Sequence, residues 1–464
     1  MFKINKSMFR EYDIRGQVEQ DLTPEAIDLI GRGYGAFLAK RGVKKVVVGY
    51  DAREYSERIK NTFARALAST GVDVVDVGMV LSPILYFAQY HYKFKGGAMI
   101  TASHNPNGWS GFKLGYDLAT TLLPDDIAEM YQIIASGKFP KGRGQIRKRT
   151  GIIDAYTKQV LSRIKLARPM KVVVDAGNGT AGPIAPPILR AAGCQVIERF
   201  CDLDYSFPNH EPNPTLVEVL EGLGQAVVKN HADLGVGYDG DGDRLGTVDN
   251  LGGSVWADKV IILLARSILK KYPGSKIVFD VKCSDALPED VLAHGGVPVM
   301  WKTGHSYIKQ KSNEVDAALG GERSGHIFFR RDYYSYDDAI FASLKLLEYL
   351  SREKQTLSEI LKTLPQYVSS PTWQVDCADE VKYGVVEKLT KEFKRDYGAK
   401  QVIDINGARV KFPNGWGIVR ASSNLPVLVL GFEAKTKKQM AEITAIFKKK
   451  LLKYPEIGKK WKSG

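Results

Sequence analysis

The sequence predicts an α/β protein with three similar domains, followed by a smaller α+β domain. Three strand-like runs rich in valine or isoleucine end on aspartates, Asp51, Asp175 and Asp280. Each run is followed by a helix-like stretch that closes on glycine, and then by a second apolar run. Strand, helix and strand in this order are typical of βαβ units on a parallel or mixed sheet. A triplicated α/β domain is therefore the simplest interpretation of residues 1–368.

The C-terminal part has a different pattern. Residues 382–398 predict an amphipathic helix, and a final helix is expected at 436–454. Between them, residues 407–422 and 427–434 predict two strands around a short turn, as in a small domain with an antiparallel sheet. We accordingly expect four domains, at residues 1–150, 151–255, 256–368 and 369–464.

The composition is that of an ordinary globular protein, with 464 residues, 44% hydrophobic and 25% charged. No apolar run approaches the roughly 18 residues of a membrane span, and the N-terminus lacks the apolar region of a secretory signal. The four cysteines, Cys194, Cys201, Cys283 and Cys377, form no CxxC pair. Free thiols in a reducing compartment fit this pattern, so we expect a cytoplasmic protein.

The net charge of +14 raises the question of a nucleic-acid partner. Much of the charge is local, because residues 448–464 contain seven lysines and one acidic residue, Glu456. No arginine-rich arm, zinc-finger spacing or aromatic RNA-binding motif accompanies it. We expect a solvated lysine-rich surface, with no nucleic-acid or membrane partner, and a monomer or weak homo-oligomer.

The stretch "GYDGDGDRLG" predicts a metal site. Asp239, Asp241 and Asp243 alternate with glycine, so an extended loop would point all three carboxylates the same way. Converging carboxylates repel one another unless a cation lies between them, and oxygen-only ligands favour Mg²⁺ or a similar hard ion. The EF-hand pattern does not fit, because its glycine and glutamate positions hold Arg244 and Asn250.

A second glycine pattern, "DAGNGTAG", matches the dinucleotide fingerprint G-x-G-x-x-G at Gly177, Gly179 and Gly182. Pro186 and Pro187 fall in the first turns of the helix that would bind the pyrophosphate. We interpret the segment as a tight strand-to-helix turn instead.

The stretch "MITASHNPNGWSGFK" places Ser103 beside His104 in a loop after a strand. The chain contains no G-x-S-x-G elbow and no Walker A motif, so Ser103 is neither an esterase serine nor a P-loop serine. A serine beside a hard cation can carry a phosphoryl group and transfer it. The alternative is a serine that only stabilises a surface turn.

Further basic and polar clusters lie in loops. Arg420 precedes two serines in a turn between strands, a pattern suited to cradling phosphate. Loops at corresponding strand ends of three α/β units, together with that turn, suggest one shared cleft. The other residues singled out in these loops are Lys282, Lys302, His305, Lys309, Glu322, Ser324, His326, Ser422, Ser423 and Asn424.

Five motifs, in this order along the whole chain, resemble those of the α-D-phosphohexomutases, in the phosphomannomutase/phosphoglucomutase branch. They are "FREYDIRG" (Phe9–Gly16), "TASHNP" (Thr101–Pro106), "DGDGDR" (Asp239–Arg244), "GERSGH" (Gly321–His326) and "RASSNLP" (Arg420–Pro426). The resemblance implies three α/β domains and a C-terminal domain of the TATA-box-binding-protein-like type, around a central cleft.

The same resemblance implies the roles of individual residues. Ser103 would be the phosphoserine, and it would complete a Mg²⁺ site with Asp239, Asp241 and Asp243. Glu322 and Ser324 would hold sugar hydroxyls. The reacting end would be lined by Tyr12, Arg15, His104, Lys113, Arg244, Lys282 and His305, with His326 close by, and the non-reacting phosphate would be held by Arg420, Ser422, Ser423 and Asn424. Two positions depart from the family pattern: Arg323 replaces a common methionine, and the phosphate turn reads S-S-N-L.

The implied activity is the interconversion of hexose 1-phosphate and hexose 6-phosphate, with mannose or glucose as the sugar. The implied route passes through hexose 1,6-bisphosphate, which also serves as an activator. Lys113 and Arg244 would stabilise transition-state charge, while the general base stays open. The alternatives are a phosphoglucosamine mutase or bisphosphate synthase on the same scaffold, or a non-catalytic sugar-phosphate-binding protein.

Overall fold

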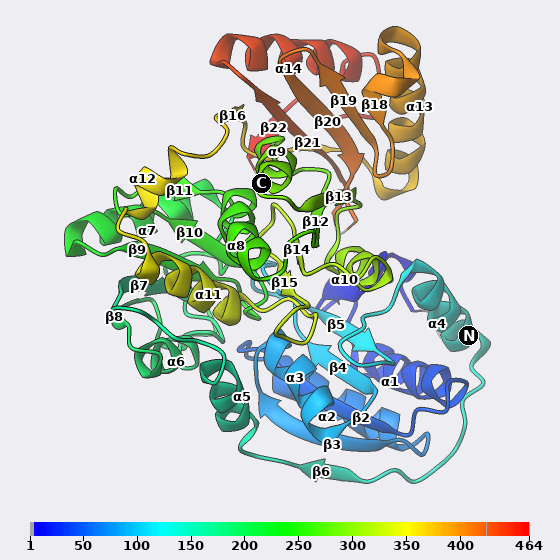
Figure 1. Cartoon of the computed structure of the whole chain (residues 1–464). Coiled ribbons are helices and arrows are strands. Elements are labelled where there is room, and N and C mark those ends of the chain that lie inside the picture. The colour runs from blue at the N-terminus through cyan, green and yellow to red at the C-terminus, as the bar shows by residue number, and fades with distance from the viewer. Residues whose placement is uncertain (1–3, 424, 464) are drawn as a thin grey trace.

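The N-terminal domain is built on the first of four sheets in the described part of the chain (Figure 1). The computed structural model describes residues 4–423 and 425–463. The sheet order is β1-β5-β4-β2-β3-β6, and η1 (Lys6–Met8) precedes it. The elements of this domain are β1 (Ile14–Gln17), α1 (Pro24–Ala39), β2 (Lys45–Tyr50), α2 (Ser56–Ala68), β3 (Asp73–Met79), α3 (Ser82–Tyr92), β4 (Gly96–Ile100), β5 (Trp109–Gly115), α4 (Pro124–Ser136) and β6 (Ile146–Lys148).

The second domain has a five-stranded sheet in the order β11-β10-β9-β7-β8. Its elements are α5 (Ile152–Leu161), β7 (Lys171–Asp175), α6 (Ala185–Ala191), β8 (Gln195–Arg199), α7 (Val217–Asn230), β9 (Leu234–Tyr238), β10 (Leu245–Val248) and β11 (Ser254–Val255). The G-x-G-x-x-G segment lies in the turn between β7 and α6, as expected.

The third domain has a four-stranded sheet in the order β13-β12-β14-β15. Its elements are α8 (Ala257–Lys271), β12 (Lys276–Asp280), α9 (Ala286–Ala293), β13 (Val297–Trp301), α10 (His305–Glu314), β14 (Leu319–Gly321), β15 (Ile327–Phe329), α11 (Ala339–Arg352) and α12 (Leu357–Leu361).

The same four-strand arrangement occurs in all three domains. The first strand pairs in parallel with the second and the third, in β2-β3-β4, β7-β8-β9 and β12-β13-β14. A fourth strand then returns antiparallel beside the third, as β5, β10 and β15. The predicted α/β fold with three similar domains and mixed sheets is confirmed.

The C-terminal domain is built on one antiparallel sheet in the order β18-β19-β20-β21-β17-β22, with β16 also paired to β21. The sequence predicted one strand at residues 407–422 and one at 427–434, which is too few. Pro413 and Asn414 form a turn, so that residues 407–422 fold into a hairpin of two strands, β19 and β20. The elements are β16 (Val368–Ser369), β17 (Trp373–Asp376), α13 (Asp379–Tyr397), η2 (Ala399–Gln401), β18 (Val402–Ile403), β19 (Ala408–Phe412), β20 (Gly415–Ala421), β21 (Val427–Ala434), α14 (Lys437–Leu451) and β22 (Trp461–Ser463).

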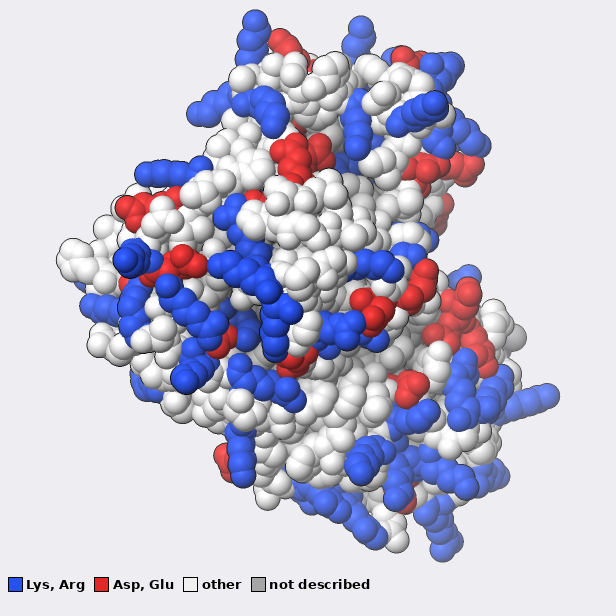
Figure 2. All heavy atoms as spheres, viewed as in Figure 1, with Lys and Arg blue, Asp and Glu red and all other residues white. Residues whose placement is uncertain are grey.

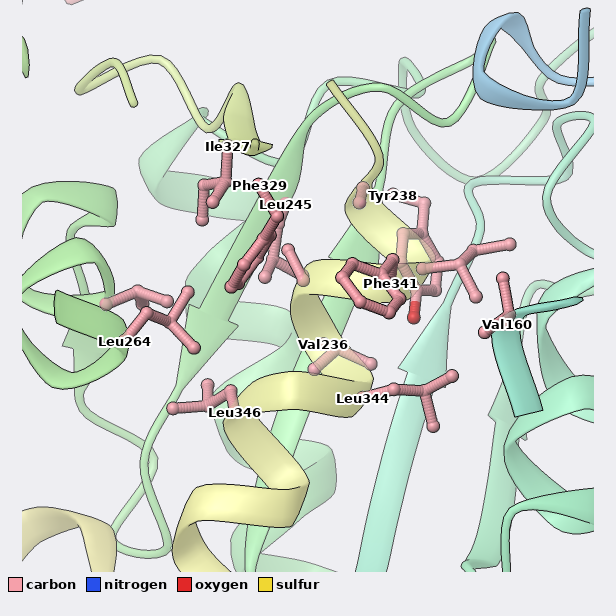
Figure 3. Packing of buried hydrophobic residues seen from close by; sticks show 14 of the residues in the cluster. Val160, Val236, Tyr238, Leu245, Leu264, Ile327, Phe329, Phe341, Leu344 and Leu346 are labelled. Carbon is pink, nitrogen blue, oxygen red and sulfur yellow. The ribbon is translucent and has the colours of Figure 1, made fainter. Parts of the chain in front are cut away.

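One hydrophobic core extends across the three α/β domains. Helix α11 of the third domain places Phe341 and Leu344 beside Val236 and Tyr238 of the second domain (Figure 3). Val160 of α5 reaches the same cluster. The C-terminal domain has a separate core between its sheet and helices α13 and α14. The α/β domains therefore share one core, whereas the C-terminal domain has its own core and meets the third domain in a small buried cluster of Val281, Trp416 and Ile418.

The lysines of the C-terminal segment are exposed, as the sequence predicted, with the exception of Lys450. Lys450 is buried and donates to Asp396, and the strand β22 pairs with β17. Elsewhere, lysine and arginine side chains are spread over the visible face with acidic residues between them (Figure 2). No helix in the described part of the chain is long and apolar enough to cross a membrane.

Candidate active site

Three of the predicted functional loops occupy the same position in the three α/β domains. The Ser103 loop connects β4 to β5, the aspartate loop connects β9 to β10, and the Glu322 loop connects β14 to β15. Each loop therefore joins the third parallel strand to the antiparallel fourth. Equivalent turns of three copies of one sheet converge on a common cleft, as the sequence analysis expected.

Ser103 is held in an uncommon backbone conformation. Its φ angle is 53°, in the left-handed region that L-residues other than glycine, asparagine and aspartate rarely adopt. Its amide donates to Thr101 Oγ1 at 2.7 Å, and its hydroxyl donates to Asp239 Oδ2 at 2.7 Å. His104 Nδ1 lies 3.2 Å from the same hydroxyl. The strained loop thus delivers the Ser103 hydroxyl to the carboxylate loop of the next domain.

Two buried arginines fix the Ser103 loop by binding its backbone. Arg53 donates from Nη2 to the carbonyls of Ser103 (3.0 Å) and Asn105 (2.7 Å), and its Nε lies 3.2 Å from Asp51. Arg15 donates to the Ala102 carbonyl at 3.2 Å. Sequence analysis placed Arg15 in the site but missed Arg53. The sequence feature that could have identified Arg53 is its position two residues after Asp51, which ends the first predicted strand.

The three aspartates of the second loop converge as predicted. Asp239, Asp241 and Asp243 are fully buried, and one oxygen of each can lie within 4.8 Å of the others. The Lys113 ammonium donates to Asp241 at 2.6 Å and also to Asp243. The Oδ1 atoms of Asp241 and Asp243 have no hydrogen-bond partner among the described residues. Buried carboxylate oxygens without partners fit a hard cation, so this cluster is a candidate metal site.

The electrostatics of the cluster reflect crowding of like charges. Burial, followed by the neighbouring charges of Asp243 and Asp241, holds the pKa of Asp239 well above its usual range. Burial acts in the same direction on Asp241, but Lys113 and the Ser82 hydroxyl outweigh it and lower the pKa of Asp241. Ser82 begins α3 and donates to Asp241 Oδ2 at 2.6 Å. The first domain thus supplies both a cation and a hydroxyl to the carboxylates of the second.

Histidines and an arginine line the cleft around the Ser103 hydroxyl. Burial, and then the charges of Arg244 and Arg15, hold the pKa of His104 well below its usual range. Arg244 Nε donates to His326 Nε2 at 3.1 Å. His326 Nδ1 in turn lies 2.9 Å from a carboxylate oxygen of the buried Asp337. Asp337 was missed by sequence analysis, because "YDDA" gives no sign of which acidic residue faces inward.

His305 and Lys309 also lie against Asp337. Lys309 Nζ donates to Asp337 at 3.1 Å, and His305 Nδ1 lies 3.9 Å from it. Neither ring nitrogen of His305 has a hydrogen-bond partner among the described residues. Burial, and then the charge of Lys309, lower the pKa of His305 well below its usual range. A neutral imidazole with free nitrogens is therefore available in the cleft.

The Glu322 loop is organised by Asp280, the strand-end aspartate of the third domain. Asp280 accepts from the Arg323 amide at 3.0 Å and from the Thr303 hydroxyl at 2.7 Å. Lys282 Nζ lies 3.6 Å from it. Glu322 accepts from the Gly304 amide at 2.6 Å. Asp280 thereby holds the two neighbouring loops that carry Glu322 and His305.

Arg323 lines the same cleft and is held by partners in the third and C-terminal domains. Its guanidinium donates to Asp258 at 2.7 Å and to the carbonyl of Ser370, at the start of the C-terminal domain, at 3.3 Å. It also lies over the Trp256 ring at 5.2 Å. The departure from the family pattern at this position therefore ties the Glu322 loop to the connection between domains.

The C-terminal domain contributes a turn between β20 and β21. Arg420 Nε donates to Asn406 Oδ1 at 2.8 Å, while its buried Nη2 has no partner among the described residues. Ser423 Oγ lies 3.2 Å from the Tyr12 hydroxyl. Asn424 lies outside the described residues. A buried guanidinium with an unpaired donor fits an anionic ligand.

A cavity of about 530 Å³ joins these groups. Trp109, Trp256 and Thr303 also line it, and sequence analysis did not single them out for the site. The three aspartates are fully buried and are not part of its lining, but Asp239 accepts from Ser103, which is. The predicted site residues that line it are Tyr12, Arg15, Ser103, His104, Lys113, Arg244, Lys282, His305, Glu322, Ser324, His326, Arg420, Ser422 and Ser423.

Comparison with known proteins identifies the family. Models of phosphoglucomutase/phosphomannomutase domains match all four parts of the chain: α/β/α domain I at residues 6–141, domain II at 153–252, domain III at 256–367 and the C-terminal domain at 374–450. The chain belongs to the phosphoglucomutase/phosphomannomutase family. Membership of this enzyme family, expected from the five motifs, is thereby confirmed.

Individual members of the phosphoglucomutase/phosphomannomutase family are similar over nearly their full lengths. A phosphomannomutase/phosphoglucomutase of Pseudomonas putida is 40% identical over 452 residues, which is 97% of each chain. A phosphoglucomutase of Neisseria gonorrhoeae is 37% identical and covers 98% of this chain and 99% of its own. A solved structure of a family protein from Burkholderia thailandensis has a TM-score of 0.89 at 37% identity, covering 97% of this chain and 98% of that one.

Proposed function

We propose that the protein interconverts hexose 1-phosphates and hexose 6-phosphates, with glucose or mannose as the sugar, through a phosphoserine at Ser103. The observation that carries this proposal is the 2.7 Å hydrogen bond from the Ser103 hydroxyl to Asp239, within a buried three-carboxylate cluster. A serine held against three carboxylates suits a phosphoryl carrier beside a cation and does not suit an acyl-transfer nucleophile. The names of the relatives support the same reaction.

The residues that would hold the metal are Asp239, Asp241 and Asp243, together with an oxygen of the phosphorylated Ser103. Their all-oxygen donor set favours Mg²⁺. When bound there, the ion supplies neutralisation of the charge on the phosphoryl group. The Lys113 ammonium, which already contacts two of these carboxylates, can contribute positive charge on the same side of the cleft.

In the first transfer, the bond between phosphorus and Ser103 Oγ breaks while a bond to a free sugar hydroxyl oxygen forms. The hydroxyl proton leaves to a base, and Ser103 regains a proton, so hexose 1,6-bisphosphate and the unmodified serine result. In the second transfer, Ser103 Oγ attacks the other phosphoryl group and loses its proton again, while the bond between that phosphorus and the sugar oxygen breaks and the sugar oxygen takes up a proton. The isomeric hexose monophosphate is then released.

His104 is placed to exchange the Ser103 proton. Its Nδ1 lies 3.2 Å from the hydroxyl, and its lowered pKa keeps the ring neutral in the unphosphorylated protein. Arg244, oriented by its bond to His326, supports charge on the transferring group.

The other end of the substrate would be held by the C-terminal turn and the Glu322 loop. Arg420 Nη2, which has no hydrogen-bond partner among the described residues, suits the non-reacting phosphate, and Glu322 and Ser324 suit sugar hydroxyls. Because the bisphosphate must react at either phosphate, these groups must accept both orientations of the sugar. The four buried cysteines, all free, support a reducing compartment such as the cytoplasm.

The experiment that tests the proposal combines mass and activity. Intact-mass measurement of the purified protein should show a phosphorylated fraction, mapped to Ser103. A coupled assay with trace hexose 1,6-bisphosphate should show turnover of glucose 1-phosphate or mannose 1-phosphate. Preferred turnover of glucosamine 1-phosphate, net accumulation of bisphosphate, or binding without turnover would instead indicate one of the alternative functions.

A further inference from the structure

Asp175, the buried aspartate that ends β7, anchors the connection between β8 and α7. Within the described chain, its side chain makes no hydrogen bond to the aspartate loop. It accepts instead from the Gly177 amide at 2.9 Å and from Arg199, and His210 Nε2 lies 3.1 Å from its Oδ1. His210 belongs to residues 209–216, the last part of the connection, which we call the β8–α7 segment. A histidine from outside the sheet is therefore bound to the end of the first strand of the second domain.

The His210 ring is bound on both sides. Its Nδ1 lies 2.7 Å from the carbonyl oxygen of Glu211, and its Nε2 lies 3.1 and 3.2 Å from the two oxygens of Asp175. A neutral imidazole has one N–H donor, whereas the protonated ring donates from both nitrogens, so the protonated ring fits two acceptors. Burial alone would lower the pKa of His210, but the hydrogen bond and the charge of Asp175 outweigh burial and raise it, against the opposing charge of Arg199. His210 is therefore a cation that joins Asp175 to the backbone of its own segment.

The β8–α7 segment packs against the aspartate loop through two prolines. A Cβ atom at Gly240, in the middle of that loop, would lie 3.4 Å from Pro212 Cγ and 2.5 Å from the Ser103 carbonyl oxygen. A Cβ atom at Gly246 of β10 would lie 2.4 Å from the carbonyl oxygen of Pro214. The aspartate loop is thus enclosed between the Ser103 loop and the β8–α7 segment, without space for either to shift freely.

The same segment forms part of the cleft wall. Glu211, Asn213, Thr215 and Leu216 all line the cavity that contains Ser103. Asn213 Oδ1 accepts from the Thr215 amide at 3.2 Å and from its hydroxyl at 2.7 Å, which fixes the turn before α7. A displacement of this segment would therefore reach both the cleft and the carboxylates behind it.

We propose that His210 is a positioning residue of the active site: bound between Asp175 and the Glu211 carbonyl, it holds the β8–α7 segment against the aspartate loop and keeps the metal-binding carboxylates in place beside Ser103. The proposal rests on the proposed function, which assigns those carboxylates to a cation. His210 is not among the described residues that line the cleft, so it acts through Pro212 and not on the substrate.

The first test measures metal binding and turnover of His210→Gln. The glutamine amide is neutral and does not replace a cation that donates on both sides. Affinity for Mg²⁺, measured by calorimetry on the unphosphorylated protein, should fall about tenfold, a scale typical of residues behind metal ligands. In the coupled assay, kcat should fall about tenfold or more, because small displacements of reacting groups are costly. KM for glucose 1-phosphate should change less than about threefold, since the Arg420 turn and the Glu322 loop are untouched.

The matched control is His294→Gln. His294, at the end of α9, also faces an aspartate, with Nδ1 2.8 Å from the carbonyl oxygen of Asp290 and 3.1 Å from its carboxylate. This variant should keep the metal affinity and kcat of the parent. Asp175→Asn removes the partner of His210 from the other side and should reproduce the loss of metal affinity seen in His210→Gln. Circular dichroism should show the parent fold in all three variants.

The second test follows the protonation of His210 directly. Proton NMR of the Cε1–H groups resolves the seven histidines, and His210→Gln identifies the resonance by removing it. The midpoint of the His210 titration should lie above 6.5, the ordinary value. Since the cationic ring holds the segment, kcat of the parent should decline as the pH rises through this midpoint, and the decline should be missing in His210→Gln.

Four outcomes would each overturn the proposal. They are a midpoint below 6.5, the same pH profile of kcat in parent and His210→Gln, parent-like metal affinity in His210→Gln or Asp175→Asn, and an equal loss in His294→Gln. If the parent binds Mg²⁺ but does not turn over hexose phosphates, the proposed function fails, and the metal affinities and the midpoint decide the role of His210.

Discussion

Gly240 and Ser103 meet backbone to backbone, although they belong to different domains. A Cβ atom at position 240 would lie 2.5 Å from the carbonyl oxygen of Ser103. This separation is shorter than real Cβ atoms show, and the atom opposite is backbone and cannot turn aside. The close approach of the Ser103 loop to the carboxylate cluster therefore requires a residue without a Cβ atom at position 240.

The first prediction concerns this contact. Gly240→Ala should push the aspartate loop away from Ser103 and lower turnover about tenfold or more, because small displacements of reacting groups are costly. The circular dichroism spectrum should be unchanged. Gly384→Ala, where nothing lies near the added Cβ, is the control and should retain full activity. Parent-level turnover of Gly240→Ala would show that the two loops need not touch.

Ser103→Ala should abolish the covalent intermediate. Turnover should fall at least about a thousandfold, because the phosphoryl carrier is lost. Binding of sugar phosphate should persist, since the Arg420 turn and the Glu322 loop are untouched, and calorimetry measures it. Robust turnover of the variant, or label from substrate on another residue, would reject Ser103 as the carrier.

Asp241→Asn should weaken metal binding while preserving the shape of the loop. We expect Mg²⁺ affinity to fall at least about tenfold, with a parallel fall in activity at limiting metal. Titration of activity against Mg²⁺ measures the shift. Asp316→Asn, which removes an exposed carboxylate paired with Arg330 and Arg331, should leave the titration unchanged. An identical titration for both variants would argue against a metal at Asp241.

Arg420→Ala should raise KM for both hexose monophosphates by roughly tenfold to a hundredfold, because a charge-assisted contact with phosphate is lost. Both substrates should be affected alike, since the same clamp must hold either phosphate. Steady-state kinetics in the two directions of the reaction provide the measurement. An effect on one substrate only would show that Arg420 is not a shared clamp.

Asp338 gives a prediction about pH. Burial raises the pKa of Asp338 from 3.8 to about 6, even though Tyr156 and Tyr333 donate to it. The protonated form therefore stabilises the fold, fully below about pH 4, and this contribution is lost as the pH rises through 6. Relative to Asp338→Asn, which cannot titrate, the parent should lose up to about 3 kcal/mol across this range. Urea midpoints at pH 4.5 and 7.5 measure the difference, and a constant difference would contradict the shift.

The sequence predicted the triplicated fold because each strand-end aspartate follows a run of β-branched residues, a purely local signal. It predicted convergence at Ser103 and Asp239 because glycine-rich polar loops followed corresponding strands. It could not reveal Arg53 or Asp337, whose partners lie on other elements and come close only in the folded chain. The extra strands of the C-terminal domain were missed for a similar reason, since β22 exists only through its pairing with β17.

The equivalence of the three strand-to-strand turns has a consequence for how this protein can change. Each turn carries a different set of residues on an equivalent frame: the β4–β5 turn holds Ser103, the β9–β10 turn the three aspartates, and the β14–β15 turn Glu322. Two of the frames have a supporting aspartate at the end of their first strand, Asp51 behind the first turn and Asp280 behind the third. Under the proposed function, sugar preference and phosphoryl transfer therefore depend on different turns. Redesign of the β14–β15 turn alone should yield mutases for other hexoses that keep the same nucleophile and carboxylate cluster.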